Sequence, residues 1–121
     1  MFLLQLVSPE RVLVEEQVDE VQIPGLDGYL GVLPGHAPLL SELKAGGVLT
    51  YRSGAAGEKV IAVYGGFVEV QADRVRILVD FAERKEEINV EEARRQLSKA
   101  TELDDLDGIE RARAKVDAAS K

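Results

Sequence analysis

The apolar residues of this chain change their spacing once, near residue 84, and this change most constrains the fold. Up to about Glu83 they come in short Val-rich runs separated by turn residues, a pattern typical of antiparallel strands in a sandwich or barrel. From Arg84 on they recur every three or four residues, the spacing of amphipathic helices. We therefore predict a β domain over residues 1–84 and a helical region over residues 85–121.

The first part of the chain has room for eight short strands. They are expected at residues 2–7, 11–16, 20–24, 29–33, 47–51, 59–63, 67–70 and 75–79. Alternation is clear at Arg74-Val75-Arg76-Ile77, where successive side chains face water and core by turns. Residues 52–57 predict an exposed hairpin loop, and residues 71–73 predict a tight turn.

The second part predicts an antiparallel pair of helices. The first apolar series is Val90, Ala93, Leu97 and Ala100, and the second is Ile109, Ala112, Val116 and Ala119. Each series starts with a capping pattern, Asn89 before Glu92 and Asp107 before Glu110. Because these stripes are narrow and rich in alanine, docking them buries little apolar surface. We expect a weakly held, mobile appendage, and the alternative is that the hairpin is simply a solvated lid on the sandwich.

Composition excludes several classes of function. At 121 residues the chain has room for one sizeable core. It has no cysteine, which excludes disulfides and thiolate chemistry, and its net charge of −7 argues against nucleic-acid binding and adhesion to anionic lipid. The first ten residues lack a basic region, and Gln5 interrupts their apolar run. We expect no signal peptide, no spanning helix and a cytoplasmic protein.

Catalytic and metal motifs are weak. The single histidine, His36, lies among Gly35, Ala37 and Pro38 with no nucleophile motif beside it, so a turn residue bonded to nearby backbone is the favoured interpretation. No His/Asp cluster has ligand spacing, and we expect no metal site. Gly28 and Gly31 are too close together for a phosphate-binding loop.

Two stretches carry a resemblance to a known family. Residues 24–40, PGLDGYLGVLPGHAPLL, and residues 64–70, YGGFVEV, resemble the signature of the epsilon subunit of F-type ATP synthases. The resemblance implies a flattened antiparallel sandwich of about ten strands that carries a C-terminal helical hairpin. It also implies a non-catalytic part of the central stalk, bound to the gamma subunit and resting on the ring of c subunits.

This resemblance implies that the subunit turns with the ring and transmits ion-driven rotation to the catalytic head. Its implied location is the cytoplasmic face of the bacterial plasma membrane, peripheral and without direct insertion. Six residues are then expected at, or supporting, the contact with the ring or the foot of gamma: Asp27, Gly28, Tyr29, Leu33, Gly35 and His36. The alternative is that the glycines only shape turns, and we favour that alternative for Gly31.

The hairpin has a second implied role. In bacterial members it leaves the sandwich, extends along gamma and presses basic side chains against acidic segments of the alpha and beta catalytic subunits, which blocks ATP hydrolysis. The cations available here are Arg94, Arg95, Lys99, Arg111, Arg113 and Lys115. The alternative is that they pair with Glu91 and Glu110 along their own helices.

Some members bind ATP on the folded hairpin through an Ile/Leu-Asp-x-x-Arg-Ala motif. The matching positions here are Ile88, Asn89, Glu92 and Ala93. Asn89 replaces the acid, and Glu92 replaces the phosphate-facing arginine with a carboxylate. We expect ATP binding to be weak or absent and no cofactor.

Two other classes of function stay open. A free-standing sandwich that senses a small ligand under its helical lid predicts saturable binding. A small hydrolase that uses His36 with Asp27 predicts turnover that is lost on His36→Ala.

Overall fold

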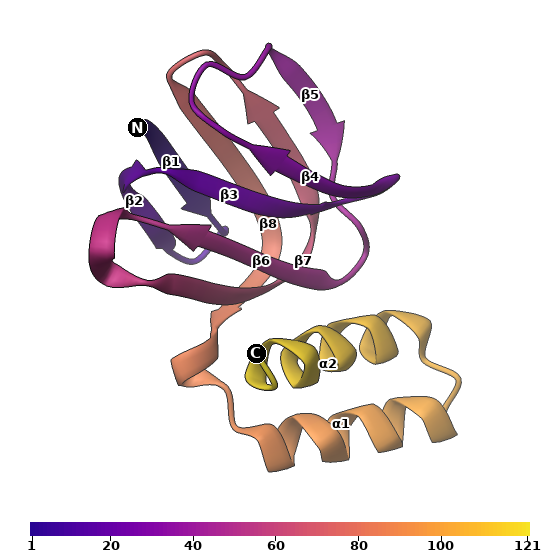
Figure 1. Ribbon diagram of the computed structural model, residues 1–121. Coiled ribbons are helices and arrows are strands. Elements are labelled where there is room, and N and C mark those ends of the chain that lie inside the picture. The colour runs from indigo at the N-terminus through magenta and orange to yellow at the C-terminus, as the bar shows by residue number, and fades with distance from the viewer.

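The Val-rich runs form the strands of one continuous sheet that folds over into a sandwich, and the charged C-terminal part forms two helices (Figure 1). The structure, a computed structural model, describes residues 1–121. The strands are β1 (Phe2–Val7), β2 (Val12–Val18), β3 (Glu20–Gly25), β4 (Gly28–Val32), β5 (Leu39–Glu42), β6 (Gly47–Arg52), β7 (Glu58–Val70) and β8 (Arg74–Arg84). The helices are α1 (Val90–Glu102) and α2 (Leu106–Ala119), with 3₁₀ turns at Gly54–Ala56 and Lys85–Glu87.

The strand order is β2-β1-β8-β7-β6-β3-β4, with β5 paired to β7 off this path. The long strand β7 joins the two layers, because residues 58–63 pair with β6 and residues 67–70 pair with β5. Between these segments Gly65 and Gly66 have φ values of 64° and 117°. A Cβ at Gly66 would collide with the carbonyl oxygen of Leu78, so the bend requires glycine there.

The structure confirms the mainly β class with a C-terminal hairpin and differs from the expected strands mainly in four ways. Strand β8 runs to Arg84, five residues past its expected end. The expected strands at 59–63 and 67–70 are two halves of β7, because the glycine pair bends the strand without ending it. Strand β5 was missed, because most of its residues are exposed and it follows Pro38. The β1–β8 pairing is parallel, an exception to the antiparallel pattern.

Alternating strand residues build the core. A cluster of 20 buried residues fills the sandwich, with Leu4, Leu6, Ile23, Leu49 and Ile77 among its largest fully buried side chains. No polar or charged residue is buried. The core contains no residue of either helix.

The two helices begin with side-chain caps. The cap predicted at Asn89 is confirmed, since its side chain accepts a hydrogen bond from the backbone N–H of Glu92 at 3.1 Å. The cap predicted at Asp107 is wrong: Asp105 caps α2, accepting from the N–H of Gly108 at 3.1 Å. The helix therefore starts two residues earlier than its apolar spacing indicates, and Asp107 is free to face the sheet.

Helix α2 lies between the sheet and α1 (Figure 1). Ala114 and Ala118 join Val48, Val60 and Ala62 in a second buried cluster, against which Ile88 packs. The backbones also come close, because a Cβ at Gly46 would lie 2.5 Å from the carbonyl oxygen of Glu110. This small interface, together with the 3₁₀ turn at Lys85–Glu87, attaches the hairpin. Neither helix is long and apolar enough to cross a bilayer.

Candidate interaction surfaces

The expected contact residues lie at the two ends of β4. Asp27, Gly28 and Tyr29 form the β3–β4 turn and the first part of β4, whereas Leu33, Gly35 and His36 follow its other end. Three residues of strand, 30–32, lie between Tyr29 and Leu33, which puts these two residues roughly 13 Å apart. Tyr29 is 62% exposed and lines a shallow hollow with Val48, Asp117 and the two residues that follow α2.

The turn after β4 explains its proline, glycine and histidine. The N–H of His36 donates to the carbonyl oxygen of Leu33 at 3.2 Å, and Gly35 has a φ of 81°. Pro34 followed by a glycine with positive φ is the pattern of a type II turn. The Nδ1 atom of His36 lies 2.7 Å from the carbonyl oxygen of Ala37, which confirms the expected turn role of this histidine.

The segment 26–40 also exposes apolar side chains. It holds five of the eleven large apolar residues that the surface exposes: Leu26, Tyr29, Leu33, Leu39 and Leu40. Single exposed apolar residues are ordinary, but several in one short segment mark a surface that another molecule covers.

A second exposed apolar surface was not anticipated from the sequence. Val12, Leu78 and Phe67 are 55%, 51% and 54% exposed, and Val7 connects Val12 to Leu78 across paired strands. Because directly paired residues point to the same face, these four form one row, which we call the outer row. Glu42, paired with Phe67, ends it. A hollow of about 390 Å³ lies along Val7, Phe67 and Leu78.

A signal for the outer row was present in the strand pattern. Val75, Ile77 and Val79 are buried, so the apolar Leu78 occupies a position where alternation calls for a polar residue. The same holds for Phe67 beside buried Val68. Apolar residues at the solvent-facing positions of a strand indicate a docking face.

The basic residues of the hairpin are divided between two environments. Arg94, Arg95, Lys99, Arg111 and Arg113 are exposed, and Lys115 is half-buried. Arg111 and Lys115 face the sheet, where the Arg111 guanidinium lies 4.8 Å from the ring centre of Tyr64 and 5.5 Å from that of Phe81. None of the six cations makes an ion pair with Glu91 or Glu110.

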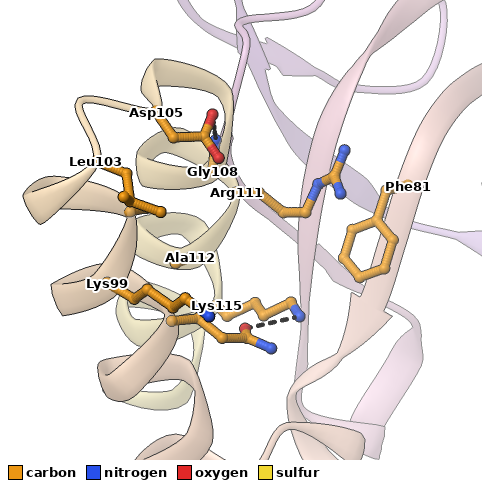
Figure 2. A pocket seen from close by; sticks show the side chains of 10 residues that line it. Phe81, Lys99, Leu103, Asp105, Gly108, Arg111, Ala112 and Lys115 are labelled. Carbon is orange, nitrogen blue, oxygen red and sulfur yellow. Dashed lines mark hydrogen bonds between the residues drawn. The ribbon is translucent and has the colours of Figure 1, made fainter.

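A hollow of about 350 Å³ opens between the two helices and Phe81 (Figure 2). Lys99 from α1 and Arg111 and Lys115 from α2 line it, and Leu103 stands at its rim near the helix–helix loop (Figure 2). Three cations against the single carboxylate of Asp105 give this hollow a net positive lining.

The positions of the ATP motif lie at the opposite end of α1. Asn89 is occupied as the helix cap, and Ile88 packs against the second cluster. Glu92 lines a small hollow of about 110 Å³ with Glu83, Glu87 and Lys115. Three carboxylates around one ammonium group give this end an acidic character, which disfavours a phosphate.

A bidentate ion pair ties the start of the hairpin to the sandwich. The two terminal nitrogens of Arg11 donate to Glu87 at 2.8 and 2.9 Å, and the backbone N–H of Arg84 donates to Glu87 at 3.0 Å. These contacts, the Arg11 hydrogen bond foremost, lower the pKa of Glu87 to about 2. We call this contact the Arg11–Glu87 clasp. It anchors the 3₁₀ turn that precedes α1.

No group of three or more His, Cys, Asp and Glu side chains in the structure could hold a metal ion. The 26–40 segment, the outer row and the exposed hairpin cations are surfaces that suit protein contacts. A sandwich of this topology with a two-helix C-terminal hairpin and exposed apolar strand faces defines a docking subunit of a larger assembly.

Comparison with known proteins identifies that assembly. The family model for the ATP synthase delta/epsilon chain β-sandwich domain matches residues 1–85. The chain is 54% identical over 97 residues to the ATP synthase epsilon chain of Solibacter usitatus, covering 80% of this chain and 71% of that one. It is 50% identical over 97 residues to that of Moorella thermoacetica, covering 80% and 72%.

A solved structure agrees. A chain in the F1/c-ring assembly of the Euglena gracilis mitochondrial ATP synthase superposes with a TM-score of 0.73 at 26% identity, over 99% of this chain and 81% of that one. The chain described here belongs to the ATP synthase epsilon-chain family, whose members are non-catalytic subunits of the complex.

Proposed function

We propose that this subunit works in the rotor of an F-type ATP synthase, docked on the gamma subunit and resting on the ring of c subunits. Rotation of the ring would pass through these contacts to the catalytic head. The proposal rests on the presence of two exposed apolar surfaces on one sandwich, the outer row and the 26–40 segment. The exposed side chains of these surfaces are not part of the sandwich core. The location that follows is peripheral, at the cytoplasmic face of a bacterial plasma membrane.

The two surfaces suit different partners. The outer row is a flat, apolar strip across four strands, which fits a helical or coiled-coil partner such as gamma. The 26–40 segment exposes Leu26, Tyr29 and Leu33 near the two ends of β4 and Leu39 and Leu40 on β5, which fits the contact with a ring of loops.

The docking test uses catalytic heads with gamma from the same organism, purified without this subunit and titrated with the full chain. Leu78→Glu places a charge in the middle of the outer row and is expected to weaken binding at least tenfold, roughly the effect of losing one central contact. Leu106→Glu is the matched control, because Leu106 is 74% exposed and lies on the hairpin. Equal binding by the native chain and Leu78→Glu would exclude the outer row as the docking face.

We also propose that the extended hairpin inhibits ATP hydrolysis through its cations. Arg94, Arg95 and Arg113 face water in the docked hairpin and are available to an acidic partner without rearrangement. In the same titration, the native chain should inhibit hydrolysis, and a chain with these three arginines changed to glutamine should bind equally and inhibit less. Equal inhibition by both chains would remove the exposed arginines from the mechanism.

A second candidate function, ligand sensing by the hairpin, rests on the electropositive hollow beside Phe81. For ATP we propose weak or absent binding, because Glu92, Glu83 and Glu87 surround the motif end of α1. Calorimetric titration of the isolated chain with ATP should give no saturable heat. Tight binding would overturn this proposal and favour the sensor.

A further inference from the structure

One face of α2 presents three charged side chains at a spacing of four residues. Asp107, Arg111 and Lys115 are one helical turn apart and therefore form a single stripe. This stripe is separate from the alanine contact, in which Ala114 and Ala118 pack on β6 and β7. The helix thus meets the sheet through an apolar line and a polar line.

The sheet carries three partners for this stripe. Tyr64 on β7 and Phe81 on β8 are directly paired, so their rings lie side by side on one face, and Glu83 lies two residues further along β8 on that face. These strands belong to the sandwich. The partners are therefore fixed in place whatever the hairpin does.

The contacts match along the whole stripe. Interaction with the Asp107 carboxylate is the largest of the causes that raise the pKa of Tyr64. The Arg111 guanidinium lies over both rings, at 4.8 and 5.5 Å from their centres, and the Lys115 Nζ lies 4.9 Å from the Phe81 centre. The same Nζ is 3.7 Å from Glu83 and donates to Gln96 of α1 at 3.4 Å.

We infer that the Asp107–Arg111–Lys115 stripe is a latch that holds the helical hairpin on the sandwich, with the Phe81 ring as its central contact. Phe81 is the one ring that faces both cations, and Lys115 connects the sheet to both helices. The alanine contact alone is small, since only Ala114 and Ala118 of α2 join the second cluster. Docking therefore depends on the polar line.

The latch also determines which cations are free. While it is closed, the exposed Arg111 keeps its guanidinium over the Tyr64 and Phe81 rings and the half-buried Lys115 lies over Phe81, whereas Arg113 on the opposite side of α2 is exposed without a ring contact. Opening the latch is the step that releases the first two to another partner. Arg111 cannot lie over the Tyr64 and Phe81 rings and bind another partner at the same time.

Amide hydrogen exchange on the isolated full-length chain tests the latch. Arg111→Gln removes the stacked cation, and α1 and α2 amides are expected to exchange about five to ten times faster while sandwich amides are unchanged. Raising the salt concentration should speed hairpin exchange in the native chain, because the Lys115–Glu83 pair is partly exposed and screened. Arg113→Gln is the matched control and should behave as the native chain does. Equal exchange in the native chain and both variants would overturn the latch.

Phe81→Leu keeps the proposal testable if Arg111→Gln also loosens β7 and β8. It retains apolar volume, removes the ring from both cations and is expected to speed hairpin exchange; unchanged exchange would contradict the latch. The exchange experiment uses the isolated chain, whereas the rotor function is tested by binding to the catalytic head. Either proposal can therefore be rejected while the other stands.

Discussion

Asp104 is the one non-glycine residue with a positive φ, at 54°. It ends α1 in a Schellman arrangement, in which the N–H of Asp105 bonds to the carbonyl of Ala100 and that of Asp104 to the carbonyl of Thr101. The left-handed backbone costs an L-residue energy that glycine does not incur. Asp104→Gly should therefore raise the free energy of unfolding by about 0.5 kcal/mol, measured by urea denaturation.

A substitution at the neighbouring aspartate, Asp105, is the matched comparison, and it should change the free energy of unfolding in the opposite direction. Asp105 has an ordinary φ of −84° and caps α2, so Asp105→Ala should lower the stability of the hairpin by about 1 kcal/mol. If Asp104→Gly destabilises as much as Asp105→Ala, the left-handed residue is not strained.

The same two residues show what the sequence can resolve at this scale. The pattern Asp-x-x-Glu occurs at Asp107, but an acid also stands at Asp105, and local spacing alone does not choose between them. The choice is made by the sheet, since a helix that starts at Leu106 turns Asp107 toward Tyr64. The identity of the residue that caps α2 depends on tertiary contacts. Tertiary contacts also decide which hairpin cations face the sheet and which face water.

At the scale of elements, the 3₁₀ turn Lys85–Glu87 is the connection between sandwich and hairpin. Its Arg11–Glu87 clasp holds a carboxylate whose pKa is lowered from 4.5 to about 2. A lowered pKa stabilises the folded state above the unfolded pKa, and this contribution is lost as the pH falls from about 5 through 2. Because the two side chains are 39% and 36% exposed, the clasp contributes at most about 1 kcal/mol.

Glu87→Gln should therefore lower the free energy of unfolding by up to about 1 kcal/mol at pH 7, and the difference from the native chain should vanish near pH 2. Urea denaturation across pH 2–7 measures it. Glu86→Gln, an exposed neighbour without an ion pair, is the control and should leave stability unchanged at every pH. A pH-independent effect of Glu87→Gln would place its role in packing.

Sequence patterns found some strands closely and missed the extent or the existence of others. Strands β1, β3, β4 and β6 were found within one residue at each end, whereas β8 runs five residues past its expected end at Val79 although its burial alternates. Three of the four residues of β5 are exposed, and β2 has a bulge opposite Leu6 and Val7 that buries both Leu13 and Val14. Alternation cannot predict such positions, and for the same reason it left the exposed Val12 of the outer row unnoticed.

At the scale of the whole molecule, the chain holds two unequal cores. The cluster of 20 residues belongs to the sandwich, and the cluster of five joins it to α2. The predicted division at residues 84 and 85 stays a prediction. The Arg11–Glu87 clasp ties the chain to the sandwich three residues later, at Glu87, and Ile88 beyond it packs against the smaller cluster.

A chain ending at Glu87 tests this division. It keeps the large core and the clasp, and it exposes Val48, Val60 and Ala62, which α2 covers in the full chain. We expect it to fold cooperatively, with native chemical shifts in β1 and β8 and a loss of stability of about 1–3 kcal/mol from the uncovered side chains. A chain ending at Arg84 lacks the clasp and should be less stable by up to a further 1 kcal/mol or so. If the chain ending at Glu87 is unfolded, the hairpin is part of the folding unit. Departure of the hairpin from the sandwich would then unfold the docking surfaces, and the hairpin could not act as a separate inhibitory element.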